Sequence, residues 1–310
     1  MKKILILFLL IFCFNSKGYS LDFSAIFKPS IENEIKNFIK EHDKAYSKQN
    51  IEEVKTFYDE NYISADGYNL NKLGEMLENT YSSYENIKYK SKINNIITSN
   101  NWAIIQMEDR TTAQVNPLKD KEIDKDKLGF LESESSYIIY LKKDKNNEWK
   151  IIQDDVLTEE TTLKYGIAKK IDIELLTPMF IKNGGEYDLA LNIKNPKDIV
   201  ALASISREEI SFPPNLNNEK YRKMPQEGTL ERLVKANDKN LDEYGSATVG
   251  FTKISFNEEK TKARIEVLGM AYIVKRINME NTKIPREEML VEKKWQKETT
   301  KLLFFIFWWL

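Results

Sequence analysis

The chain has 310 residues, of which 41% are apolar and 31% are charged, and its formal net charge at neutral pH is −1. This length is enough for two domains of ordinary size, and the composition is typical of a soluble globular protein rather than a disordered or membrane-embedded one. The basic residues form no stripe that would attract phosphates, so we predict no nucleic-acid partner.

Residues 1–20 have the pattern of a secretory signal peptide. Two lysines precede the apolar run of residues 4–14, and small residues stand at the −3 and −1 positions of a cleavage site after Ser20. The run is shorter than the roughly 20 residues that a helix needs to span a bilayer. We therefore predict a cleaved signal, and export across the cytoplasmic membrane to the periplasm, the cell envelope or the outside of the cell.

Cleavage at this position removes three lysines and changes the net charge from −1 to −4. It also removes Cys13, the only cysteine, so the mature chain has no disulfide, no thiol nucleophile and no cysteine ligand for a metal. A lipid anchor on Cys13 is disfavoured, because the bulky Phe12 precedes it where a small residue is usual. With a single histidine in the chain besides, we predict no metal site and no cofactor.

Residues 29 to about 50 have the spacing of one amphipathic helix. Ser30 can cap it, and two glutamates follow in the first turn, where the helix dipole favours negative charge. Its apolar face recurs every three or four residues, at Ile31, Ile35, Phe38, Ile39, His42, Ala45 and Tyr46. A shorter helix over 51–58, a loop with a turn at Asp66-Gly67 and a third helix over 71–84 are expected next.

After residue 85 the apolar period changes from 3.6 to 2, which predicts strands. We expect four, at about 86–99, 102–115, 135–143 and 148–157, with a long charged hairpin loop between the second and the third. Three helices followed by an antiparallel meander predict an α+β layout, in which the first helix covers the concave face of a curved sheet.

Two runs in this region resemble the nuclear transport factor 2-like (NTF2-like) superfamily: AYSKQNIEEVKTFYDENYISADGY, which begins in the last turns of the first helix, and NNEWKII in the last hairpin. This superfamily includes SnoaL-type polyketide cyclases and ketosteroid isomerases, and the resemblance covers about residues 30–158. It implies a cone-shaped domain, here 29–158, with a pocket between the first helix and the sheet. It also implies a homodimer through the convex sheet face, where Trp102, Ile104 and Tyr140 point outward.

The pocket implied by the resemblance has nine candidate lining residues: His42, Tyr46, Tyr58, Tyr62, Asp66, Asp109, Trp149, Gln153 and Asp155. Alternate residues of a strand share one face, so Trp149, Gln153 and Asp155 are expected to point together into the cone. Asp109 is the one charged residue on the inward face of its own strand.

An isomerase-like member of the superfamily needs a carboxylate or histidine as base, and a tyrosine or protonated acid to stabilise an enolate. Asp109, His42 and Tyr58 are the candidates for these catalytic roles. Each also has a structural interpretation. A histidine on an apolar face is commonly a hydrogen-bonded core residue, Asp109 could pair with a lysine or arginine at the cone mouth, and the tyrosines could be core aromatics.

Residues 166–280 contain short apolar strand patterns separated by turn sequences such as NGG, NPK and PPNLNN. This pattern predicts a second, β-rich domain of sandwich type, joined to the first by a polar connector at 158–166. The region resembles no family that we recognise, and it contains no nucleophile elbow, phosphate loop or metal-ligand spacing.

Residues 281–310 combine a charged segment with an apolar, aromatic tail that runs from Leu302 to Leu310. The tail is too short to span a membrane as a helix. Three interpretations stay open: peripheral contact with a membrane interface, a terminal strand that docks on the second domain, and a tail without a role.

The sequence favours an exported, non-catalytic protein that binds a small apolar ligand or a protein partner, because no complete catalytic set is evident. One alternative is an isomerase, cyclase or hydrolase-type enzyme that uses Asp109 with His42 or a tyrosine. The other is a peripheral envelope protein held by residues 302–310.

Overall fold

The structure, a computed structural model, describes residues 30–115, 128–194, 198–210, 220–256 and 263–280. The predicted signal peptide and the apolar tail lie outside these residues. Within the described part of the chain, no helix is long and apolar enough to cross a membrane.

Three helices precede the strands: α2 (Ile31–Ser47), α3 (Ile51–Lys55) and α4 (Leu70–Ser83). Each begins after a polar residue whose side chain accepts a hydrogen bond from the backbone N–H three residues on, namely Ser30, Asn50 and Asn69. The cap predicted at Ser30 is therefore confirmed, as are the acidic residues in the first turn of α2. The predicted apolar face of α2 supplies Ile35, Ile39, His42 and Ala45 to the interior.

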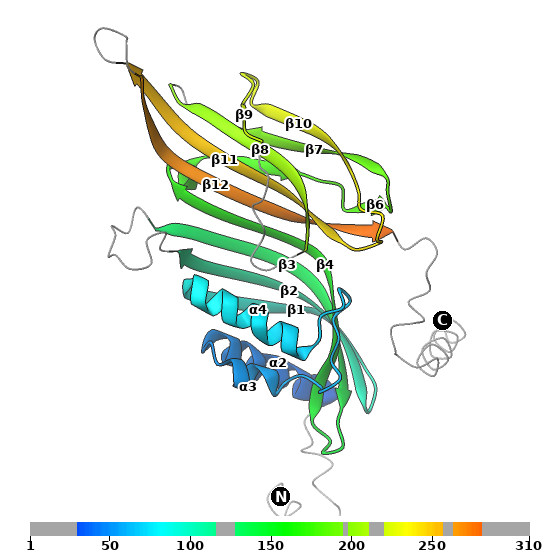
Figure 1. The fold of residues 1–310 in the computed structure, drawn as a ribbon. Helices are drawn as coiled ribbons and strands as arrows, with labels where there is room; N and C mark the ends of the chain where they lie inside the picture. The colour runs from blue at the N-terminus through cyan, green and yellow to red at the C-terminus, as the bar shows by residue number, and fades with distance from the viewer. Residues whose placement is uncertain (1–29, 116–127, 195–197, 211–219, 257–262, 281–310) are drawn as a thin grey trace, which may run out of the picture.

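Nine strands form one large sheet (Figure 1). Its order is β1 (Glu85–Thr98), β2 (Trp102–Val115), β3 (Gly129–Lys143), β4 (Trp149–Gly166), β12 (Ala263–Glu280), β11 (Glu243–Phe256), β8 (Val200–Glu209) and β9 (Arg222–Lys223), with β6 (Phe180–Lys182) beside β12. Only β6 pairs in parallel within the described ladders of this sheet. A short 3₁₀ helix, η3 (Ile167–Lys170), follows β4.

Two strands are longer than predicted. β3 begins at Gly129 rather than near 135, and β4 continues to Gly166 rather than ending near 157. The extensions pair with each other, and they are stabilised by cross-strand hydroxyl contacts at 2.6 Å between Ser133 and Thr161 and between Ser136 and Thr158. The predictions of a loop up to residue 135 and of a polar connector at 158–166 are therefore wrong, because hydroxyl pairs replace the apolar alternation that marks a strand.

The extended part of β4 also pairs with β12, from Glu160 opposite Lys275 to Gly166 opposite Gly269. The sheet therefore runs without a break from the half of the molecule that carries the helices into the half built from residues beyond 166, as Figure 1 shows.

A second sheet of three strands, β10 (Thr229–Lys235), β7 (Glu186–Ile193) and β5 (Ile173–Leu176), packs on this second half. Its side chains share a hydrophobic core with β8, β11 and β12, including Leu175, Leu189, Leu191, Val249, Phe251 and Ile273. A separate core joins the helices to β1–β4, including Ile35, Ile39, Ile105, Met107, Leu141 and Ile151. The chain is thus a sheet-rich α+β fold, as predicted.

The helices and the small sheet lie on opposite faces of the large sheet. Ile273 belongs to the core under the small sheet, whereas its neighbours Tyr272 and Val274 face a cavity beside α4. On β2 and β3, Ile104 and Tyr140 lie opposite each other on the face away from the helices. The homodimer expected through this face stays a prediction.

Candidate functional site

A cavity of about 390 Å³ lies between the helices and the large sheet. Six tyrosines line it: Tyr46, Tyr81, Tyr84, Tyr89, Tyr244 and Tyr272. The aliphatic lining consists of Leu77, Ile87, Ala113, Leu131, Leu163 and Val274, and the hydroxyl lining of Thr80, Thr111, Ser133 and Thr161. No charged side chain lines this cavity among the described residues. Its volume falls in the range of about 300–1,000 Å³ that holds small organic ligands.

The strand register builds the floor of the cavity. One row of directly opposed residues crosses four strands from Ala113 through Leu131 and Leu163 to Tyr272. The adjacent row crosses the same strands from Thr111 through Ser133 and Thr161 to Val274. The second half of the chain therefore closes a cavity that the sequence predicted within the first half alone.

The polar atoms of the lining are largely bonded to protein partners. The hydroxyl of Tyr244 donates to Glu159 at 2.7 Å, that of Tyr272 to Glu208 at 3.3 Å and that of Tyr89 to Asp109. The hydroxyls of Ser133 and Thr161 bond to each other. The cavity therefore presents ring faces and aliphatic groups rather than unpaired hydrogen-bonding atoms.

Asp109 lies behind this lining. Its Oδ2 accepts hydrogen bonds from the hydroxyls of Tyr89 and Tyr137, the latter at 2.5 Å, and its Oδ1 is buried without a hydrogen-bond partner. Burial raises the pKa of Asp109 to about 6, the two tyrosine hydrogen bonds act in the opposite direction, and the charge of Asp43 adds to the rise. The lysine or arginine partner considered from the sequence is thus replaced by two tyrosines.

His42 belongs to a neighbouring cluster. Its Nε2 is 3.3 Å from the hydroxyl of Tyr58, and its Nδ1 is 3.6 Å from Oδ1 of Asp43. The other oxygen of Asp43 accepts from Ser91, which is directly opposite Asp109 in the sheet. Asp43 therefore lies between His42 and Asp109, two of the three predicted catalytic candidates, and His42 and Asp109 share no hydrogen bond.

Two of the nine residues predicted from the sequence to line a pocket face away from the interior. β4 has a bulge at Ile152, so that Leu141 is opposite Ile151 but Tyr140 is opposite Gln153. The extra residue shifts the alternation, and Asp154 takes the inward position that was predicted for Asp155. The prediction that Gln153 and Asp155 point into the cone with Trp149 is therefore wrong.

Asp154 is a buried carboxylate that the sequence pattern missed. Its Oδ2 accepts a hydrogen bond from the hydroxyl of Tyr62 at 2.9 Å. Burial raises the pKa of Asp154 to about 6, against the effect of this hydrogen bond, and Asp66 and Asp155 add to the rise. The loop before α4 covers the adjacent edge of β4, since the N–H of Ala65 donates to the carbonyl of Asp154 at 2.8 Å.

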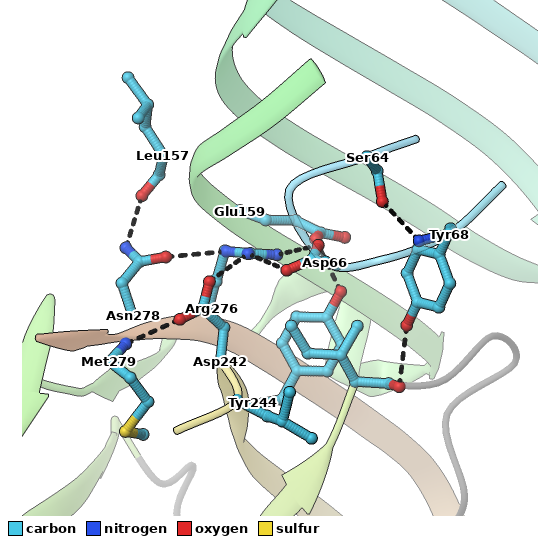
Figure 2. A network of polar contacts seen from close by, with 12 residues as sticks. Ser64, Asp66, Tyr68, Leu157, Glu159, Asp242, Tyr244, Arg276, Asn278 and Met279 are labelled. Carbon is cyan, nitrogen blue, oxygen red and sulfur yellow. Dashed lines mark hydrogen bonds and ion pairs between the residues drawn. The ribbon is translucent and has the colours of Figure 1, made fainter. Parts of the chain in front are cut away.

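Asp66 takes part in a contact between the two halves of the chain (Figure 2). The guanidinium of Arg276, on β12, donates to both carboxylate oxygens of Asp66, at 3.0 and 2.6 Å, and to Asp242 at 2.6 Å. Its side chain is 1% exposed. Burial alone would lower the pKa of Arg276, but the two carboxylates hold it above its ordinary value.

The same network contains Glu159, whose buried carboxylate accepts from Tyr244. Burial raises the pKa of Glu159, while Tyr244 and the charge of Arg276 act in the opposite direction. Asn278 completes the network by accepting from Nε of Arg276 at 2.9 Å and donating to the carbonyl of Leu157 at 2.8 Å. Leu157 is the second bulged residue of β4, so Asn278 satisfies a carbonyl that the strand ladder leaves free.

Of the nine predicted pocket residues, Tyr46 lines the cavity. His42 packs on Tyr46 with ring centroids 4.8 Å apart, and Asp109 contacts the lining residue Tyr89. Tyr58, Tyr62 and Trp149 are buried in the core beneath the helices. In the described part of the chain no group of three or more histidine, cysteine, aspartate or glutamate side chains could hold a metal ion.

Comparisons with known proteins give distant structural neighbours. A ketosteroid isomerase-like protein from Erwinia carotovora atroseptica is 13% identical, with a TM-score of 0.31 over 39% of this chain and 91% of its own. An NTF2-like family protein from Streptomyces avermitilis is 8% identical, with a TM-score of 0.31 over 40% of this chain and 93% of its own. ActVI-ORFA from Streptomyces coelicolor is 10% identical, with a TM-score of 0.30 over 42% and 95%.

These neighbours are of the kind that the motifs in residues 30–158 resemble, and they cover about 40% of the chain. Likenesses this distant assign no activity. No protein-family model and no curated protein matches the chain.

Proposed function

We propose that the protein binds a small, uncharged and largely apolar molecule in the cavity between α4 and the large sheet. The observation that carries this proposal is the cavity itself: its volume is ligand-sized, and its lining among the described residues has six aromatic rings and no charged side chain. Transfer of apolar ligand surface from water into such a site is worth about 25 cal/mol per Å² before the cost of immobilisation. The absence of charge in the lining favours neutral ligands, because an ion would lose its hydration without gaining a partner.

The test is a titration with phenylnaphthylamine, an uncharged apolar dye that fluoresces in apolar surroundings. Leu163 lies in the middle of the cavity floor, so Leu163→Trp should fill the cavity and reduce dye affinity at least tenfold. Leu233→Trp is the matched control, because Leu233 is 60% exposed on β10 in the second sheet. Equal dye affinity in the wild type and in a folded Leu163→Trp variant would reject the proposed site.

Acid–base catalysis is a second candidate function, favoured by the carboxylate of Asp109 between two tyrosine hydroxyls. A base whose pKa is about 6 is suited to proton transfer near neutral pH. The geometry supports it less well than binding, because Asp109 is absent from the cavity lining and its Oδ2 already accepts from both tyrosines.

The two functions differ in proton exchange on a bound ketone. A catalytic Asp109 would accelerate deuterium exchange at the carbon next to the carbonyl of a cyclic ketone, and Asp109→Asn would abolish the acceleration. If the protein only binds the ketone, exchange should be no faster than in buffer for the wild type and for Asp109→Asn, as measured by mass spectrometry.

The export predicted from residues 1–20 is also part of the proposal, and N-terminal sequencing of the secreted or envelope fraction tests it.

A further inference from the structure

The hairpin formed by β11 and β12 exposes an apolar strip beyond the cavity. The strip consists of Leu202, Ile254, Phe256, Ile265, Val267 and Met270, and their exposed fractions run from 36% to 66%. Contiguous apolar surface of this kind is unusual on a soluble protein and marks a binding surface.

The strip lies on the same face of the sheet as the cavity. Met270 is two residues from the lining residue Tyr272 on β12, and residues two apart on a strand share a face. Gly250 is directly opposite both Met270 and Leu202. Further along, Val267 is opposite Thr252, and Ile265 is opposite Ile254. The apolar surface therefore continues from the cavity floor along the hairpin.

In the outer part of the hairpin, beyond Met270, the charged residues lie on the other face. Lys253 is opposite Glu266, and Arg264 is opposite Ser255, in positions that alternate with the strip. Both Lys253 and Arg264 are exposed. The six strip residues are themselves uncharged, and the exposed Lys223 of β9, directly opposite Leu202, lies at the edge of the strip.

Tyr165 stands at the junction of the cavity and the strip. It is opposite Met270 and two residues beyond the lining residue Leu163. Its ring occupies the space over Gly129, where a methyl group would collide with it. Because Gly129 has no side chain, the ring of Tyr165 lies against the sheet over β3, on the side of β4 away from Met270, and extends the apolar floor there.

We propose that the ligand is an elongated amphiphile with a single long hydrocarbon chain, part of which occupies the cavity while the rest lies along the strip. This inference rests on the proposed function. A compact ligand would leave the strip exposed to water, whereas a linear chain can follow the sheet face past Tyr165. Between Met270 and Ile265 the strip is about 13 Å long, because their partners Gly250 and Ile254 are four residues apart, at roughly 3.3 Å per residue.

A homologous series of saturated alcohols, from short to long, tests the inference by displacement of phenylnaphthylamine. Each methylene that leaves water for the protein tightens binding about fourfold. In the wild type we expect this gain to continue past the chain length that fills the cavity. In the double variant Ile265→Ser and Val267→Ser the gain should stop at a shorter chain, while short alcohols bind as they do to the wild type.

Leu233→Ser, at an exposed leucine of β10, is the matched control and should keep the wild-type chain-length dependence. If wild type and strip variant stop gaining affinity at the same chain length, the elongated ligand is rejected while the cavity site survives. If no alcohol displaces the dye, the proposed function itself fails. A strip variant that changes only the oligomeric state or the binding to lipid vesicles would assign the strip to a second copy or to a membrane, and overturn the inference.

Discussion

At the scale of single residues, the most unusual group is the carboxylate of Asp109. It accepts two tyrosine hydroxyls with one oxygen, and its other oxygen is buried without a partner. Burial therefore disfavours its charged form, and its pKa rises to about 6. Because the folded protein keeps this proton to a higher pH than the unfolded chain does, Asp109 makes its stabilising contribution below about pH 4. That contribution is lost as the pH rises to about 6.

Asp109→Asn should make stability less dependent on pH between about 4 and 7. The amide cannot ionise, so the variant lacks the loss of about 2–3 kcal/mol that the wild type suffers over this range. Urea unfolding at a series of pH values measures the effect. An unchanged slope in Asp109→Asn would contradict the buried position of this carboxylate.

At the scale of elements, the bulges of β4 decide which side chains enter the interior. The extra residue Ile152 places Asp154 in the inward position opposite Ile139, and the second bulge at Leu157 frees a carbonyl that Asn278 binds. Bulges commonly re-aim a side chain in this way next to a binding site.

The bulge at Ile152 predicts losses of stability of different size for two neighbouring substitutions. Asp154→Ala removes the acceptor of the Tyr62 hydroxyl and should lower the free energy of unfolding by about 1–3 kcal/mol. Asp155→Ala should cost less than half as much, because Asp155 faces outward. Chemical denaturation of both variants measures the difference. A larger loss at Asp155 would contradict the bulge, because it would mean that Asp155 rather than Asp154 faces the interior.

Local patterns predicted some of these elements well. The cap at Ser30 and the stripe of α2 depend on residues a few positions apart, and β2 alternates regularly through Asp109, so its inward direction could be predicted. The bulge at Ile152 has no comparable signal, because Lys150 to Asp155 alternate acceptably in either phase. Tyr89 and Tyr137 were missed as partners of Asp109 because their contact depends on the register between strands.

At the scale of the whole molecule, the two halves are joined by a continuous sheet and by the buried Arg276. β12 pairs with β4 as far as Glu160, and beyond that point the guanidinium of Arg276 bonds both Asp66 and Asp242. This pairing brings Tyr244 and Tyr272 to the cavity. The sequence pattern could not reveal it, because residues 158–166 resemble a connector and their partner strand is about 100 residues away.

Arg276→Ala should destabilise the protein by about 3–5 kcal/mol, because it leaves two carboxylates without their buried cation. Thermal unfolding monitored by circular dichroism measures the loss. Lys275→Ala is the matched control: its ion pair with Glu160 is partly exposed to solvent and should contribute no more than about 1 kcal/mol. Similar losses in the two variants would contradict the buried network.

The proposed function places an uncharged apolar ligand in the cavity that both halves of the chain close. Methyl NMR tests it most directly, by titration of the protein with a saturated alcohol. We expect shifts at the lining residues Leu77, Leu163 and Val274, and none at Leu175 and Leu189 in the core under the small sheet. Unchanged methyl signals at the three lining residues under saturating alcohol, or equal shifts in both groups, would contradict the claim.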